Sequence, residues 1–188
     1  VDMAGGEGSP FRDLYVIEPL STSFGMVLIM QDLGTPLMQV FSRSQESAGV
    51  LKTLNFAQLA TELEYLQQTG LAHGDVRRHN LVVDDRNRVR LVDLDECGRV
   101  PTSRIMPTAA EAGTLVPYPS PDLLKGGKAR AQAAAYTGYQ VLRLVVDNKW
   151  MQVHPDIVAL LRNVSNGQQI TIEDGRTLWD TAMETLKK

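Results

Sequence analysis

Cysteine is almost absent from this chain of 188 residues, which contains Cys97 alone. A single cysteine cannot form an internal disulfide, and no zinc-ligand spacing surrounds it. We therefore expect a reducing, intracellular compartment, cytoplasmic or nuclear. The longest apolar runs, such as MVLIM from Met26, are far too short to cross a bilayer. Residues 1–10 also lack the apolar segment of a secretory leader, so no membrane association is expected.

A strong excess of charge of either sign is also missing. The formal net charge is -3, which gives no broad electrostatic attraction to nucleic acid or to anionic lipid. Hydrophobic residues make up 43% of the chain and charged residues 22%, which is typical of a globular domain. The length fits one domain of ordinary size. We therefore expect no nucleic-acid partner.

The first half of the sequence predicts a strand pair followed by a helix. LYVIEPL from Leu14 and FGMVLIM from Phe24 are strand-like and are separated by STS, which predicts an antiparallel pair. QDLGTPL from Gln31 predicts a turn-rich connection, and residues 42–49 have an irregular polar pattern. Residues 53–68 predict a helix, because apolar residues recur there at helical spacing. Asn55 and Gln58 resemble a capping box, and Gly70 is placed to end this helix.

The second half predicts a small hairpin and a run of helices. LVV from Leu81 and VRLV from Val89 are two short strands, and DDRN between them predicts the turn. A long loop without periodicity is expected over residues 98–122. Helices are expected over 129–146, 155–164 and 178–186. The order predicts an α+β fold whose second part is mostly helical.

Polar side chains stand at the ends of this predicted hairpin. Asp75 and Asn80 precede its first strand, and Asp93 follows its second strand. Because a hairpin brings its two ends together, Asn80 and Asp93 are expected to converge beside Asp75. An amide and a carboxylate suit a Mg²⁺ ion that also takes phosphate oxygens, and a separate carboxylate can accept a proton from a hydroxyl. These are the parts of phosphoryl transfer. The alternative is a polar hairpin whose side chains only cap turns.

The segment HGDVRRHN from His73 resembles the catalytic loop of the protein kinase superfamily, H-x-D-x-x-x-x-N. LVDLD from Leu91 resembles the strand and metal-binding aspartate of the D-F-G motif. The HGD triplet is also similar to the aminoglycoside and choline phosphotransferases of the same superfamily. Gly113-Thr114 with YPSPD from Tyr118 resembles the end of an activation segment, which favours the protein kinase branch.

The resemblance implies the large lobe of a protein-kinase-like domain with a truncated small lobe. Residues 1–10 would be a flexible lead-in, 11–36 the remaining small-lobe strands and hinge, and 37–188 the large lobe. Met30 stands at the gatekeeper position of this family. The hinge would offer backbone groups to adenine at Gln31, Asp32 and Leu33.

The resemblance also implies roles for individual residues. Asp75 would be the catalytic base, and Arg77 would steady the transferred phosphate. Asn80 and Asp93 would hold Mg²⁺, and Thr114 would support Asp75. The implied activity is ATP- and Mg²⁺-dependent transfer of phosphate to a protein hydroxyl, of the Ser/Thr type. Other interpretations remain open: His73 as a structural residue and Arg77 with Arg78 as a solvated basic face.

Several features of the family are missing. No Gly-x-Gly-x-x-Gly stands between strands, and the first lysine is Lys52, beyond the hinge. The nucleotide phosphates therefore lose a cover and a clamping charge, and the chain alone should bind ATP weakly. Gly74 follows His73 in place of an arginine, which disfavours activation by loop phosphorylation. Ala133 replaces the aspartate that anchors the catalytic loop, and Gln169 replaces the arginine that pairs with a late acidic residue, here Asp122.

These departures leave a second function open: a pseudokinase or truncated kinase-like module that binds another protein. The face where a complete small lobe would sit is expected to be apolar, so a partner or self-association is expected there. A small-molecule phosphotransferase, suggested by HGD, is a third and less favoured hypothesis.

Overall fold

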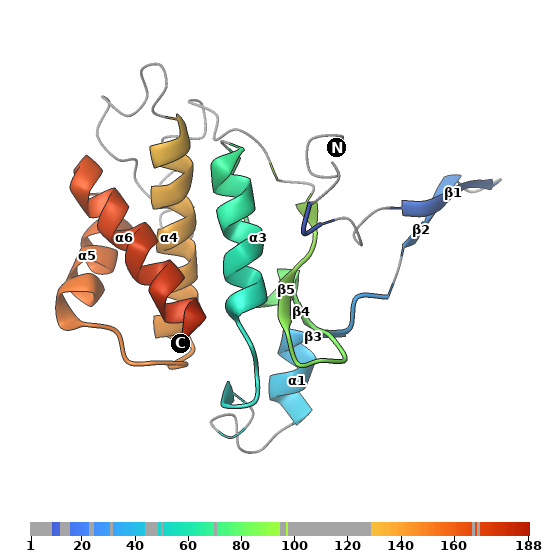
Figure 1. Ribbon diagram of the computed structural model, residues 1–188, viewed down its shortest axis with the longest axis horizontal. Helices are drawn as coiled ribbons and strands as arrows, with labels where there is room; N and C mark the ends of the chain where they lie inside the picture. The colour runs from blue at the N-terminus through green and yellow to red at the C-terminus, as the bar shows by residue number, and fades with distance from the viewer. Residues whose placement is uncertain are drawn as a thin grey trace.

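The computed structural model describes residues 9–11, 16–22, 25–30, 32–43, 49, 51–69, 71–94, 97, 129–166, 168 and 170–188. Helices α3 (Ala57–Gln68), α4 (Ala129–Asp147) and α6 (Ile172–Lys187) lie side by side, with α5 (Pro155–Ser165) beside α4 (Figure 1). A small antiparallel sheet packs on the other side of α3 (Figure 1). The predicted α+β class is confirmed, and the arrangement is consistent with a truncated kinase-like lobe.

The first two strands form the predicted antiparallel pair. β1 (Val16–Thr22) pairs with β2 (Gly25–Met30), with an irregularity in register between Val16 and Glu18. The pair projects away from the helices and lies beyond the three-stranded sheet (Figure 1).

The second sheet has the order β3-β4-β5 and contains the predicted hairpin. β4 (Leu81–Val83) pairs with β5 (Val89–Leu91), and every residue of both strands is buried. The turn between them is closed by a hydrogen bond from Asn87 N to Asp84 O of 3.1 Å. Asn87 has φ +57°, a left-handed conformation that asparagine tolerates well. The prediction of DDRN as the turn is therefore confirmed.

Two short elements, the edge strand of this sheet and a helix that follows it, were not predicted. β3 (Thr35–Pro36) adds to β4, and α1 (Leu37–Arg43) follows directly. Elements of two and seven residues are too short to produce a recognisable period. Tertiary contacts stabilise α1, since it packs on β3, on β4 and on the turn η3 (Arg78–Asn80), with Leu37 fully buried.

The ends of two helices differ from the prediction. The proposed capping box of α3 is wrong, because Phe56 is the N-cap and Gln58 donates to Glu62 (3.3 Å). Gly70 lies outside the described residues. The last helix begins at Ile172 instead of 178, behind a capping box in which Thr171 and Asp174 bond to each other's backbone N–H. Helices α4 and α5 are confirmed.

Buried apolar residues of α3, α4, α5, α6 and the β4-β5 hairpin form one hydrophobic core. At the crossing of α4 and α6, a Cβ on Gly138 would lie 2.6 Å from Trp179 N and 2.7 Å from Leu178 C. Only glycine permits these backbones to approach so closely. None of the helices in the described ranges has the length and apolarity needed to cross a membrane.

A buried charged group connects the core to the sheet. Glu62 on α3 is 0% exposed and accepts hydrogen bonds from Leu91 N (2.7 Å) and Arg90 Nε (3.0 Å). Burial raises the pKa of Glu62, and the bonds from Leu91 and Arg90 oppose this shift. Arg90 also donates to the carbonyl of Pro10 (2.8 Å), and the neighbouring Phe11 is fully buried. The end of β5, which leads to Asp93, is therefore fixed to α3.

Candidate functional site

The candidate site begins where the chain leaves α3 and turns toward β4. Leu71, Ala72 and His73 are buried, whereas Gly74 and Asp75 are only partly covered. Gly74 has φ +85°, a conformation that an L side chain rarely adopts, so glycine permits the turn that presents Asp75. Val76 is buried again, so Gly74 and Asp75 are flanked by buried residues on both sides.

Asp75 and Asn80, two of the predicted site residues, are in direct contact. The Asn80 Nδ2 group donates to the Asp75 carboxylate at 2.8 Å and to the Asp75 carbonyl at 2.9 Å. Only an amide nitrogen can make both bonds, so this network fixes the orientation of the Asn80 amide. Asn80 is 5% exposed, whereas the Asp75 side chain is 31% exposed. The carboxylate therefore keeps access to solvent while its partner is buried.

Arg77, the other predicted catalytic residue, also contacts this carboxylate. Its Nε lies 2.8 Å from Asp75 Oδ2, the same oxygen that Asn80 contacts. The Arg77 side chain is 59% exposed, so the pair is solvated and weak. Arg77 is thus more than a solvated basic side chain, but it can leave Asp75 at little cost.

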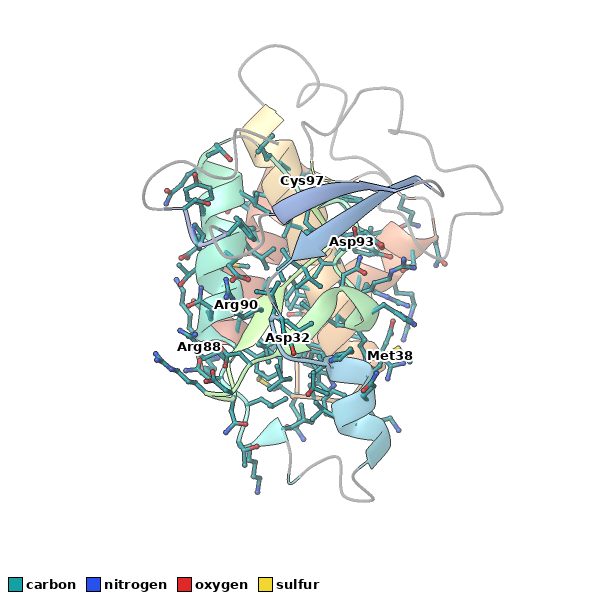
Figure 2. All side chains as sticks on the ribbon, turned by 90° about the vertical axis from the view of Figure 1, so that its right-hand side faces the viewer. Asp32, Met38, Arg88, Arg90, Asp93 and Cys97 are labelled. Carbon is teal, nitrogen blue, oxygen red and sulfur yellow. The ribbon has the colours of Figure 1, made fainter. Side chains whose placement is uncertain are left out.

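The backbone brings Asn80 next to the strand that leads to Asp93. Val92 N donates to Asn80 O at 2.9 Å. Asp93 follows directly, is exposed, and has φ +63°, which is uncommon for a residue other than glycine. Asn80 therefore lies beside Asp75 and next to the strand that leads to Asp93. Figure 2, viewed from the side on which β1 and β2 project, shows Asp93 on the face of the molecule that lies behind this strand pair.

His73 connects the two halves of the site. Its ring is fully buried, its Nε2 lies 3.0 Å from Val92 O, and its Nδ1 accepts from Asp75 N at 3.3 Å. This pattern requires the neutral ring with its proton on Nε2. Burial lowers the pKa of His73, although Asp75 and Asp93 oppose that shift. His73 therefore connects, as a neutral ring, the loop before β4 that carries Asp75 and the segment after β5 that carries Asp93. The structural interpretation of His73 expects such a role.

Sequence reasoning missed three hydrogen bonds between α4 and this loop, which two α4 side chains make. Tyr136 Oη and Gln140 Nε2 each donate to Gly74 O at 2.9 Å, and Val76 N donates to Gln140 Oε1 at 3.4 Å. The available signal was a tyrosine and a glutamine four residues apart, and thus on one face, of a helix otherwise rich in small apolar residues. Ala133, on the same α4, is buried and has no polar side-chain group.

The predicted nucleotide-binding positions are only partly described. Met30 ends β2, and Gln31 lies outside the described residues. Asp32 is exposed and accepts from Gly34 N at 2.9 Å, and Leu33 is half-buried. Figure 2 shows Asp32 close to the start of α1. A Cβ on Gly34 would lie 2.2 Å from Val83 O, so this connection is held against β4. Adenine contacts at these four positions remain a prediction, and Thr114, Asp122 and Gln169 lie outside the described ranges.

The donor set suits an ion that is shared with a ligand. Within the described ranges, His, Cys, Asp and Glu side chains form no group of three or more that could hold a metal by themselves. Asn80 and Asp93 offer one amide oxygen and one carboxylate. Mg²⁺ is commonly held by one or two protein oxygens together with phosphate oxygens and waters. The residues present fit a magnesium–phosphate complex better than a metal bound by protein alone.

Comparison with known proteins shows a distant likeness to a kinase-related protein. No family model matches the chain. It is 29% identical over 114 residues to a human protein described as ribosomal protein S6 kinase-related protein. The match covers 58% of this chain and 26% of the relative, so the chain corresponds to about a quarter of that protein's length. The likeness supports a kinase-like relationship.

Proposed function

We propose that the chain carries the large-lobe half of a phosphoryl-transfer site, which uses ATP and Mg²⁺ and acts on a protein hydroxyl of the Ser/Thr type. The double hydrogen bond from Asn80 to Asp75 carries the proposal, together with the Asn80–Val92 backbone bond. Three features support it: the partly exposed carboxylate of Asp75, the buried amide of Asn80 that contacts it, and the exposed Asp93 two residues after β5. The likeness to a kinase-related protein supports the same class.

In this proposal Asp75 is the general base. The hydroxyl oxygen of the substrate forms a bond to the γ-phosphorus, its proton moves to the Asp75 carboxylate, and the bond to the ADP oxygen breaks. When bound, Mg²⁺ would neutralise the charge of the phosphates, and Asn80 and Asp93 would hold it. The Asn80 amide and the Gly74 turn keep Asp75 aimed at the substrate.

Arg77 has two alternative partners in this scheme. Without ligand it pairs with Asp75 at 2.8 Å. An entering phosphate group competes for the guanidinium, because arginine binds phosphate oxygens with good geometry. We propose that Arg77 then moves to the transferred phosphate and releases the base. Because the pair is largely exposed, this exchange costs little.

A second candidate function is a pseudokinase-like module that binds a protein partner. The given residues hold no Gly-x-Gly-x-x-Gly between strands and their first lysine is Lys52, so a phosphotransferase would need both parts from sequence outside these residues or from a partner, whereas a binding module would not. A site without these parts holds nucleotide weakly and transfers phosphate slowly or not at all. In this case Asp75, Asn80 and Asp93 would be retained as scaffold, and the face near β1 and β2 would take the partner or a second copy of the chain.

Transfer of labelled phosphate from ATP to a mixture of Ser/Thr peptides separates the two functions. The first predicts Mg²⁺-dependent incorporation, which Asp93→Asn abolishes and Asp75→Asn lowers by roughly 10²- to 10⁴-fold. Asp85→Asn is the matched control, since Asp85 is an exposed aspartate in the β4-β5 turn. Incorporation that is equal in all four proteins contradicts the assignment. Complete absence of transfer in the parent favours the binding module.

A further inference from the structure

We propose that Gln140 on α4, assisted by Tyr136, is the positioning residue that sets the backbone on both sides of Asp75. Gln140 Nε2 donates to the carbonyl of Gly74, and Gln140 Oε1 accepts from the N–H of Val76. One side chain thus holds the residue before and the residue after the proposed base. This inference rests on the role proposed for Asp75.

The chemistry of the two contacts explains why an amide stands here. Gly74 presents an acceptor and Val76 presents a donor, and only a side chain with both functions satisfies the two. Gln140 does so with distances of 2.9 Å and 3.4 Å. A carboxylate at this position would accept from Val76 N but would repel the Gly74 oxygen. Tyr136 supplies a second donor to that oxygen at 2.9 Å.

The anchor lies on the same face of α4 as Ala133. Positions separated by three and by seven residues share one face of a helix, so Tyr136 and Gln140 follow Ala133 along the loop-facing side. Ala133 is 1% exposed and cannot make a side-chain hydrogen bond. The structure thus assigns the anchoring of the loop to a neutral pair, Tyr136 and Gln140, further along the helix.

The anchor acts on Asp75 through a single peptide group. Gly74 O and Asp75 N belong to the same peptide plane, and Asp75 N donates to His73 Nδ1 at 3.3 Å. If Gly74 O loses its donors, this plane can rotate, and the Asp75 carboxylate turns with it. A small displacement of a general base is enough to lower the rate of transfer considerably.

Three variants separate the two contacts. Gln140→Leu removes both, Gln140→Glu keeps the acceptor for Val76 and removes the donor to Gly74, and Tyr136→Phe removes only the second donor. Amide hydrogen exchange, measured by NMR on the full chain, reports each contact without any need for activity. Gln68→Glu is the matched control, because Gln68 is an exposed glutamine at the end of α3.

We expect a specific pattern of exchange. Gln140→Leu accelerates exchange at both Asp75 and Val76, roughly fivefold each, as the loss of one ordinary hydrogen bond predicts. Gln140→Glu and Tyr136→Phe accelerate exchange at the Asp75 amide, while the exchange rate of the Val76 amide stays near that of the parent. Gln68→Glu changes neither. In an active preparation, Gln140→Glu lowers kcat and leaves the KM for ATP unchanged, because nucleotide contacts are not affected.

Other outcomes overturn the inference. If Gln140→Leu leaves both amides at parent rates, or accelerates the β4-β5 amides equally, Gln140 contributes only to general stability. If exchange changes as expected in an active enzyme but kcat does not fall, the loop is anchored without consequence for the base, and the positioning role is wrong. If the parent transfers no phosphate but the exchange pattern appears, the proposed function fails and the anchor stands.

Discussion

Asn80 donates two hydrogen bonds to Asp75, one to its carboxylate at 2.8 Å and one to its backbone carbonyl at 2.9 Å. The candidate metal ligand thus holds the candidate base, and the loop between them is closed on itself. Because Asn80 is buried and also accepts from Val92 N, the same residue links this loop to the strand before Asp93. Its substitution should therefore affect stability and ion binding together.

Asn80→Asp should make the fold dependent on a divalent cation. The new carboxylate would face that of Asp75 at about the present 2.8 Å, and both hydrogen bonds would be lost. We expect a loss of roughly 1–3 kcal/mol in the free energy of unfolding without cation, which Mg²⁺ partly restores by binding between the two carboxylates. Thermal unfolding in EDTA and in millimolar Mg²⁺ measures both effects.

The control for this substitution is Asn163→Asp, an exposed asparagine on α5. It should change stability by less than about 0.5 kcal/mol and show no additional response to Mg²⁺. Equal behaviour of the two variants would mean that the Asn80–Asp75 contact contributes little and that no cation binds there.

His73 should make the fold less stable in mild acid. Burial lowers its pKa from the ordinary 6.5 in the folded chain, with Asp75 and Asp93 opposing the shift. The unfolded chain therefore takes up the proton first, and stability that is present above about pH 6.5 is lost as the pH falls toward the folded pKa. Between these two pKa values the unfolded chain binds up to one proton more than the folded chain. The free energy of unfolding then falls by up to about 1.4 kcal/mol per pH unit.

His73→Gln isolates this contribution, because glutamine keeps an N–H donor and does not titrate. Urea unfolding between about pH 7 and about pH 5 should show a smaller pH slope in the variant than in the parent. If the two slopes are the same, His73 is not held neutral by burial, and the bridge between Val92 O and Asp75 N is wrongly interpreted.

Arg90→Met should leave Glu62 buried without its cation. We expect a loss of roughly 3–5 kcal/mol at neutral pH, because one partner of a buried ion pair is removed. Burial already raises the pKa of Glu62. A raised pKa means that the protonated form favours the fold, so the deficit relative to the parent should shrink as the pH falls.

The double variant Glu62→Gln with Arg90→Met tests the cause. In the parent, Leu91 N donates to the Glu62 carboxylate at 2.7 Å. The glutamine amide oxygen can still accept this bond, but it carries no charge. The double variant should recover most of the stability lost in Arg90→Met at neutral pH. A double variant that is as unstable as the single one would show that the contact of Arg90 with Pro10 O, and not the charge on Glu62, decides the cost.

Gly138→Ala should separate α4 from α6. The added Cβ would meet backbone atoms of Leu178 and Trp179 at 2.6 to 2.7 Å, which no side-chain movement can relieve. We expect a loss of roughly 1–3 kcal/mol or more, measured by denaturant unfolding. Gly175→Ala is the comparison, because its Cβ would meet only the Ala135 side chain closely, at 2.9 Å, and should cost less. An equal loss in both variants would contradict this packing.

The sequence predicts the long helices, the hairpin and the positions of the polar site residues. It does not predict the tertiary contacts that stabilise the short elements and the loop around Asp75. Helices α4 and α5 and the β4-β5 hairpin follow from periodicity and turn chemistry, which are local. The short α1 depends on burial of Leu37 against the sheet, which is a tertiary effect. The spacing of Asp75, Asn80 and Asp93 places them at the two ends of the hairpin, and their roles in phosphoryl transfer are proposals. The contacts of Gln140 and Tyr136 with Gly74 join residues more than sixty positions apart, so the local pattern on α4 shows a polar pair but not its partner.

The most direct measurement of the central claim is the thermal shift of the chain with millimolar ATP and Mg²⁺. If Asn80 and Asp93 hold a magnesium–nucleotide complex, the melting temperature of the parent rises by a few degrees, as weak binding at about ten times Kd predicts. EDTA should remove this rise, and Asp93→Asn should lack it while Asp85→Asn keeps it. A melting temperature that does not respond to nucleotide, or an equal rise in Asp93→Asn, would contradict the assignment of this site.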